Sequence, residues 1–150
     1  MKINGTHTID NTTAEQVWSF IMNPDVLAKI TPGLKQLDPV GDDEFKAISE
    51  IKIGPVKASF EGDLALTNKV EQKSTTVVVK QDSKIGNVQA SIGMEIITGD
   101  NSVTVNYDGE AKMVGKIATM GQRMVGSVVT SLSKQFFKNL ENEINNTNNP

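Results

Sequence analysis

The clearest pattern in this sequence is a long amphipathic stretch near its C-terminal end, from Val114 to Ile144. Its apolar residues recur at spacings of three and four, which place side chains on one face of a helix. These residues are Ile117, Met120, Met124, Val125, Val128, Val129, Leu132, Phe136, Leu140 and Ile144. The pattern predicts one helix from Ile117 to Ile144, about 42 Å long at about 1.5 Å per residue. Gly121 and Gly126 fall inside it, although a glycine there costs about 1 kcal/mol relative to alanine.

Upstream of this helix the pattern predicts two short helices and a series of strands. Residues 2–9 alternate between apolar and polar positions, as a strand does. The polar residues at 10–13 are typical helix N-caps, and they predict a helix at 14–22 followed by a second at 25–30. Period-two alternation then predicts six more strands. Their ranges are 37–40, 45–53, 56–66, 75–81, 88–96 and 103–113.

This order of elements predicts an α+β fold of the helix-grip type. Hairpin-length connections make the curved sheet of about seven strands antiparallel, and its one apolar face must be covered by the C-terminal helix. Residues 1–144 are expected to form a single domain, with a frayed Asn-rich tail at 145–150. A curved sheet closed over a long helix tends to enclose a cavity. We therefore expect the functional site in an apolar interior.

Composition and charge exclude several other functions. The net charge is −3, from 15 basic and 18 acidic residues that are interspersed along the chain. This argues against a nucleic-acid partner, which needs a basic stripe, and against purely electrostatic docking to a membrane. The absence of cysteine excludes a thiolate nucleophile or a Cys-based zinc site. No cofactor is expected. With no secretory signal and no apolar run long enough to span a bilayer, we expect a cytoplasmic protein.

Strand parity and the helical stripe select the residues expected to contact a ligand. They are Phe45, Phe60, Met94, Tyr107, Met113, Met120, Gly121, Met124 and Val128. The methionines also fit an ordinary core, and the glycines also fit close packing of a helix on a sheet. Tyr107 is the favoured polar contact because its hydroxyl ends an apolar ring. His7, the single histidine, is a second candidate, with no acidic partner near it in the sequence.

Three short motifs follow one another along this chain. They are Val17-Trp18 with Pro24, Leu27 and Pro32-Gly33, then Gly54-Pro55-Val56-Lys57 with Phe60 and Gly62, and then Gly115-Lys116-Ile117-Ala118 with Gly121, Arg123-Met124 and Phe136-Phe137. Together, over residues 6–140, they resemble the CoxG family of carbon monoxide dehydrogenase subunits, which belongs to the SRPBCC or START-like superfamily. Members often have cysteine on either side of the Pro-Gly, but this chain has none. A thiol-dependent role is therefore excluded.

The resemblance implies a non-catalytic accessory protein of a molybdenum hydroxylase of the CO dehydrogenase type, which helps to recruit that enzyme to the inner face of the cytoplasmic membrane. It also implies an apolar cavity. An isoprenoid quinone would connect the two implications, because it is apolar, membrane-resident and redox-active. Two alternatives stay open. One is a cyclase- or dehydratase-like enzyme acting on a polyketide-like substrate, which needs an acid or base facing the cavity. The other is a structural protein whose core is filled.

Overall fold

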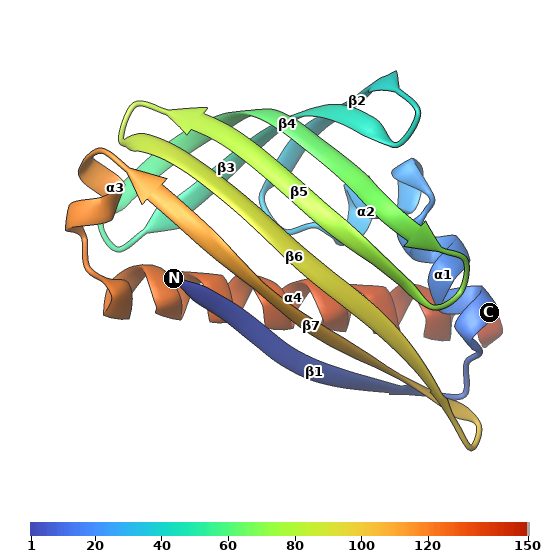
Figure 1. The fold of residues 1–150 in the computed structure, drawn as a ribbon. Coiled ribbons are helices and arrows are strands. Elements are labelled where there is room, and N and C mark those ends of the chain that lie inside the picture. Colours follow the sequence, from blue (N-terminus) through green and yellow to red (C-terminus); the bar gives the residue numbers. More distant parts are fainter. Residues whose placement is uncertain (150) are drawn as a thin grey trace.

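The computed structural model describes residues 1–149 and shows a seven-stranded sheet curved around a long C-terminal helix (Figure 1). The strands are β1 (Lys2–Asp10), β2 (Leu34–Gly41), β3 (Glu44–Ile53), β4 (Val56–Val70), β5 (Ser74–Ser83), β6 (Gly86–Gly99) and β7 (Ser102–Val114). The helices are α1 (Ala14–Ile21), α2 (Pro24–Ile30), α3 (Lys116–Thr119) and α4 (Gln122–Asn148). The predicted α+β helix-grip fold is confirmed.

The sheet is an antiparallel meander with open edges. Its strand order is β1-β7-β6-β5-β4-β3-β2, so β1 and β2 are the two edge strands. All six neighbouring pairs are antiparallel, as the short connections predict. Strand β2 pairs with β3 irregularly, with register shifts between Leu34 and Gln36 and between Pro39 and Gly41. Helix α4 contacts both β1 and β3, and it therefore crosses the open side of the curved sheet (Figure 1).

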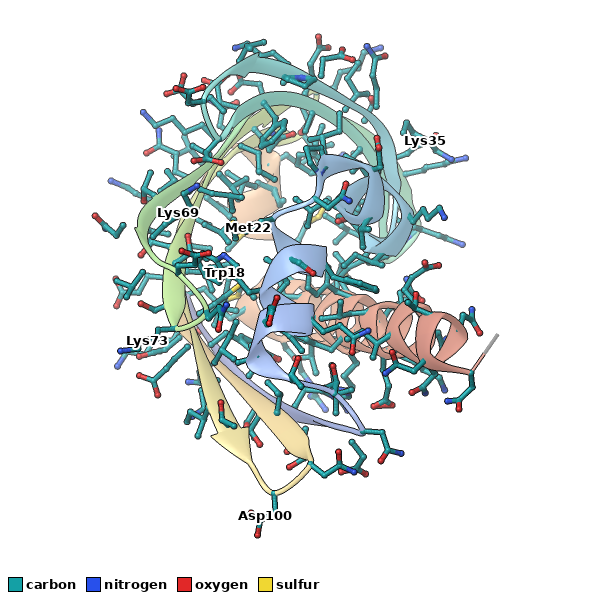
Figure 2. All side chains as sticks on the ribbon, turned by 90° about the vertical axis from the view of Figure 1, so that its right-hand side faces the viewer. Trp18, Met22, Lys35, Lys69, Lys73 and Asp100 are labelled. Atoms are coloured by element: carbon teal, nitrogen blue, oxygen red, sulfur yellow. The ribbon has the colours of Figure 1, made fainter. Side chains whose placement is uncertain are left out.

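The two short helices begin at capping residues that the sequence already indicates. The side chain of Thr13 accepts a hydrogen bond from the Gln16 backbone N–H at the start of α1, and the side chain of Asn23 does the same for Asp25 at the start of α2. The side chains that pack these helices against the core include Trp18 and Met22. Figure 2 shows these two side chains within the curve of the sheet. Together, α1 and α2 close one end of the molecule.

The core consists of two apolar clusters at opposite ends of the sheet. One cluster joins α1, α2 and the C-terminal half of α4, where Phe137, Leu140 and Ile144 are buried. The other joins the β3–β4 hairpin, α3 and the first turn of α4, around Phe60 and Val125. The middle of α4 lies between these clusters.

The predicted continuous helix from Ile117 to Ile144 is wrong, because the chain breaks at Gly121. Helix α3 ends at Thr119, and Gly121 is the N-cap of α4 with φ +87° and ψ 146°. That conformation is open to glycine and strained for other residues. The spacing of apolar residues runs on across the break, so periodicity alone does not show it. Gly121 therefore lies outside the helix that was expected to contain it.

Helix α4 continues through Asn145–Asn148, within the range for which the sequence predicts a frayed tail. The side-chain amide of Asn148 donates a hydrogen bond to the Asn11 carbonyl oxygen at 2.9 Å. The Thr147 hydroxyl donates to the Glu143 carbonyl oxygen one turn earlier. Pro150 lies outside the described residues. The C-terminal end of α4 is thus tied to the segment that follows β1.

Candidate ligand-binding cavity

A cavity of about 390 Å³ lies between the concave face of the sheet and the helix α4. All seven strands contribute to its wall, together with α3, α4 and the segment after α2. Its apolar lining includes Ile3, Leu34, Ile51, Phe60, Leu64, Val77, Val79, Val88, Ala90, Ile92, Met94, Ala111, Met113, Val125, Val128, Leu132, Phe136 and Phe137. The volume falls within the range of about 300–1,000 Å³ that is usual for small-molecule pockets. The sheet and the helix therefore leave space for a ligand.

Short side chains in the middle of the sheet account for this space. In the antiparallel register, Val79 of β5 lies opposite Ala90 of β6, and Ala90 lies opposite Ala111 of β7. Both alanines face inward, as their place in the lining shows. A methyl group reaches less far toward α4 than the leucine, isoleucine and methionine side chains elsewhere on this face. The sheet therefore meets α4 at its two ends, and its middle stays open.

Gln81 is the most buried polar side chain of the lining, with 8% of its surface exposed. Its Nε2 donates a hydrogen bond to the Asp63 carbonyl oxygen at 3.3 Å. Its Oε1 is buried and has no hydrogen-bond partner among residues 1–149. Buried polar atoms are nearly always paired, so an exception of this kind calls for an explanation.

Tyr107 lies in the wall at the other end of the cavity, next to Phe137. Its ring stacks on that of Phe137 with centroids 5.1 Å apart and an interplanar angle of 20°. Its hydroxyl lies over Gly5, which is its partner on β1. A Cβ at Gly5 would clash with the Tyr107 Oη, so only glycine leaves room for the ring. The missing side chain on β1 therefore leaves the space that the Tyr107 hydroxyl occupies.

His7 lies beside the cavity wall and forms no part of the lining. Its ring stacks on Phe137 at 5.6 Å, and its Nε2 lies 3.3 Å from the Glu141 Oε1. His7 therefore has an acidic partner, although none is near it in the sequence. The partner comes from α4, 134 residues later in the chain, where proximity in the sequence gives no signal.

The structure brings together five of the nine residues that the sequence selects. Those that line the cavity are Phe60, Met94, Tyr107, Met113 and Val128. Those outside the lining are Phe45, Met120, Gly121 and Met124. The sequence places Met124 on the apolar face of the helix and among the ligand contacts, but it is 40% exposed, and its thioether packs over Gly54 in the β3–β4 turn. Gly121 is exposed and lies outside the lining, so the absence of a side chain there adds no space to the cavity. Phe45 is buried on β3, opposite Leu64 of the lining, but does not itself line the cavity.

Several polar residues of the lining are missing from the set that the sequence selects. They are Thr31, Ser49, Gln81 and Ser133. A signal existed for Gln81, because it has the same strand parity as Val77 and Val79, which face inward. Ser133 is likewise one turn from Val129 and from Phe137 on α4. In both cases the position on the element gave more information than the residue type.

Ionisable groups with shifted pKa values lie away from the cavity, on exposed strand surface. Lys57 donates a hydrogen bond to Glu50 at 2.6 Å, and this contact lowers the pKa of Glu50 and raises the pKa of Lys57. The hydrogen bond between Lys46 and Asp63 raises the pKa of Lys46. Within the cavity lining, Tyr107 is the one residue with an ionisable side chain. The cavity is therefore suited to binding and orienting an apolar molecule.

Two other kinds of site are absent from residues 1–149. No three or more His, Asp or Glu side chains in this range lie close enough together to hold a metal ion. No helix in the same range combines the length and the apolar character needed to cross a membrane.

The fold and the cavity define a START-like helix-grip protein, and solved structures agree. A START superfamily protein from Mycobacterium smegmatis matches with a TM-score of 0.76 and 14% identity, over 97% of this chain and 98% of that one. The Zhui aromatase/cyclase from Streptomyces sp. R1128 matches with a TM-score of 0.67 and 13% identity, over 95% of this chain and 92% of that one. At these identities the likeness concerns the fold.

The family is narrower than the fold. The family model for CoxG, described as a subunit of carbon monoxide dehydrogenase, matches residues 5–145, so this chain belongs to the CoxG family. A conserved protein from Geobacillus kaustophilus is similar at 30% identity and a TM-score of 0.93, over 98% of this chain and 97% of that one. No functionally curated protein matches this chain.

Proposed function

We propose that this protein is a non-catalytic accessory protein that holds an apolar, quinone-like ligand in its cavity. In this proposal it serves a molybdenum hydroxylase of the CO dehydrogenase type and helps to bring that enzyme to the inner face of the cytoplasmic membrane. The observation that carries the proposal is the apolar cavity of about 390 Å³, walled by every strand. The family description, which names a subunit of carbon monoxide dehydrogenase, supports the choice of partner.

The chemistry of the lining supports a binding role. Ligand affinity would come from burial of apolar surface, at about 25 cal/mol per Å², and a few polar groups such as Gln81 and Tyr107 would set the orientation. An isoprenoid quinone fits this description because its ring carries oxygen atoms and the rest of the molecule is apolar. Such a ligand also resides in the membrane, where the proposed partner would use it.

The enzyme alternative has a precedent for the fold and lacks support from the lining. The Zhui protein is named as an aromatase/cyclase and shares this architecture. Acid–base catalysis needs a group that exchanges a proton with the substrate, but the lining offers only the Tyr107 hydroxyl and the N-terminal amino group of Met1, which donates a hydrogen bond to the Ala111 carbonyl oxygen. The alternative of a filled structural core is opposed by the cavity itself. The binding role therefore agrees best with the geometry.

Filling the middle of the cavity tests the proposal. Ala90 faces the cavity, whereas the adjacent Ser91 is exposed on the other face of β6. We expect the Ala90→Leu variant to retain at least about tenfold less short-chain isoprenoid quinone than wild type, because the added side chain occupies ligand space. The matched Ser91→Leu variant should retain as much as wild type. Retention is measured by native mass spectrometry and solvent extraction, with circular dichroism as the check on folding.

Two results would contradict the proposal. Undiminished retention in folded Ala90→Leu protein would show that the ligand does not occupy this cavity. Failure of wild-type protein to retain any quinone, together with tight binding of a polar metabolite, would overturn the ligand class. The partner is tested separately, by measuring whether the purified protein increases co-sedimentation of a CO dehydrogenase-type hydroxylase with lipid vesicles.

A further inference from the structure

The orientation of the Gln81 side-chain amide follows from its surroundings. Its one hydrogen-bond partner is the Asp63 carbonyl oxygen, at 3.3 Å. A carbonyl oxygen only accepts hydrogen bonds, so the NH₂ group of the amide must face it. The opposite assignment would place two oxygen atoms against each other. The buried atom left without a partner is therefore the amide oxygen, Oε1, which is a hydrogen-bond acceptor.

Small residues next to Gln81 leave this part of the wall open. In the sheet register, Gln81 lies opposite Gly62 of β4, and Gly62 lies opposite Ala47 of β3. On its other side, Gln81 lies opposite Val88. No side chain of Gly62 covers the amide, and Ala47 adds only a methyl group. The lining around Gln81 thus contains little that can donate a hydrogen bond to it.

We propose that the ligand itself supplies the missing donor: a hydroxyl group of an otherwise apolar molecule binds Gln81 Oε1. This inference rests on the proposed function and specifies the form of the ligand. A carbonyl oxygen in the same place would leave two acceptors unpaired in an apolar wall, which is unfavourable. The cavity therefore selects the hydroxylated, reduced form of a quinone-type ligand over the oxidised carbonyl form.

The register also fixes how such a ligand lies. Gln81 is opposite Val88 and Tyr107 is opposite Met94, which is six residues further along β6. At about 3.3 Å per residue, the two polar groups are about 20 Å apart along the sheet. With its hydroxyl group at Gln81, the ligand places its apolar part over Ala90 and toward the aromatic end of the cavity. The last torsion angle of glutamine is soft, so the amide can turn to meet the donor.

Three matched probes test this selectivity: a short-chain isoprenoid hydroquinone, its dimethyl ether and the corresponding quinone. The ether keeps the ring and loses both donors. We expect wild-type protein to bind the hydroquinone about tenfold more tightly than the ether or the quinone, which is the usual effect of leaving one buried acceptor unpaired. Gln81→Met keeps the length of the side chain and removes the acceptor, so the preference should disappear. Gln89→Met, on the exposed face of β6, should retain it. Affinities are measured by anaerobic titration calorimetry.

Each outcome separates this inference from the proposed function. Equal affinity of the wild type for hydroquinone and quinone would overturn the role of Gln81 as an acceptor and leave the cavity as a quinone site. A preference for the quinone would overturn it as well, in favour of donation by Tyr107. A preference that persists in folded Gln81→Met protein would assign the selectivity to another group. Binding of none of the three probes would overturn the proposed function itself. If Gln81→Met does not fold, the wild-type ratios alone decide.

Discussion

Gly121 and Gly126 are alike in the sequence pattern and different in the structure. Gly121 has a backbone conformation, with φ +87° and ψ 146°, that residues with side chains rarely adopt. Gly126 is within α4 and has ordinary helical surroundings. At both positions an added Cβ would meet no atom within 4 Å. Any difference between substitutions at the two sites therefore comes from the backbone alone.

This gives a paired prediction for stability. Gly121→Ala should lower the free energy of unfolding by about 1–3 kcal/mol, because alanine is strained in that conformation. Gly126→Ala should raise it by about 0.5–1 kcal/mol, because alanine is the better helix former. Urea denaturation of both variants, followed by far-UV circular dichroism, measures the two changes. Effects of the same sign would show that the break at Gly121 is absent in solution.

Gly121 and the residues around the cavity show how much the sequence could predict for single residues. Hydrophobic periodicity reports the spacing of side chains and carries no information on backbone φ, so the break after α3 was hidden. Parity did place Phe60 and Met113 in the wall. Gln81 was also predictable by parity, but an amide in an apolar row is easily assigned to the strand end. The contact of His7 with Glu141 depends on how α4 crosses β1, and no local pattern encodes it.

At the scale of elements, α4 is a helix with two differently packed halves. Its C-terminal half buries Leu140 completely, against α1, α2 and β1. Its middle passes over the cavity, where Leu132 is partly exposed and lines the wall. Sequence alternation predicted the strands well because each strand has one buried face. It underestimated their lengths, since the strands extend beyond the buried region to their turns.

Truncation of Leu140 and of Leu132 should lower stability by different amounts, because the two side chains are packed differently. Leu140→Ala is expected to cost about 2–5 kcal/mol of unfolding free energy, since a cavity would form in a fully packed region. Leu132→Ala should cost about 1 kcal/mol, because this side chain already lacks packing partners on the cavity side. Chemical denaturation of both variants tests the difference. Equal losses of unfolding free energy would mean that the middle of α4 is packed as tightly as its end, and would contradict the presence of the cavity.

At the scale of the whole molecule, the fold contains empty space that a ligand can stabilise. A ligand that binds only the folded state adds about 2.7 kcal/mol at 100 times its dissociation constant. For a chain of this size that corresponds to roughly 5–10 °C in the melting temperature. We expect calorimetry of wild-type protein to show such a rise with the isoprenoid hydroquinone. Without ligand, Ala90→Leu protein should melt no lower than wild type, because the leucine fills the cavity. Adding the hydroquinone should not raise the melting temperature of this variant. A rise of equal size in both proteins would place the ligand elsewhere.

The open edges of the sheet have a consequence for behaviour in concentrated solution. An exposed edge strand is a template on which another chain can add a strand and start an aggregate. Strand β2 is a poor template: its pairing with β3 shifts register twice, Pro39 has no N–H to donate, and Lys35 carries a charge that Figure 2 shows projecting outward. The other edge, β1, is accompanied by α4. Both edges of this cavity-forming sheet are therefore poor sites for a second copy of the chain to add a strand.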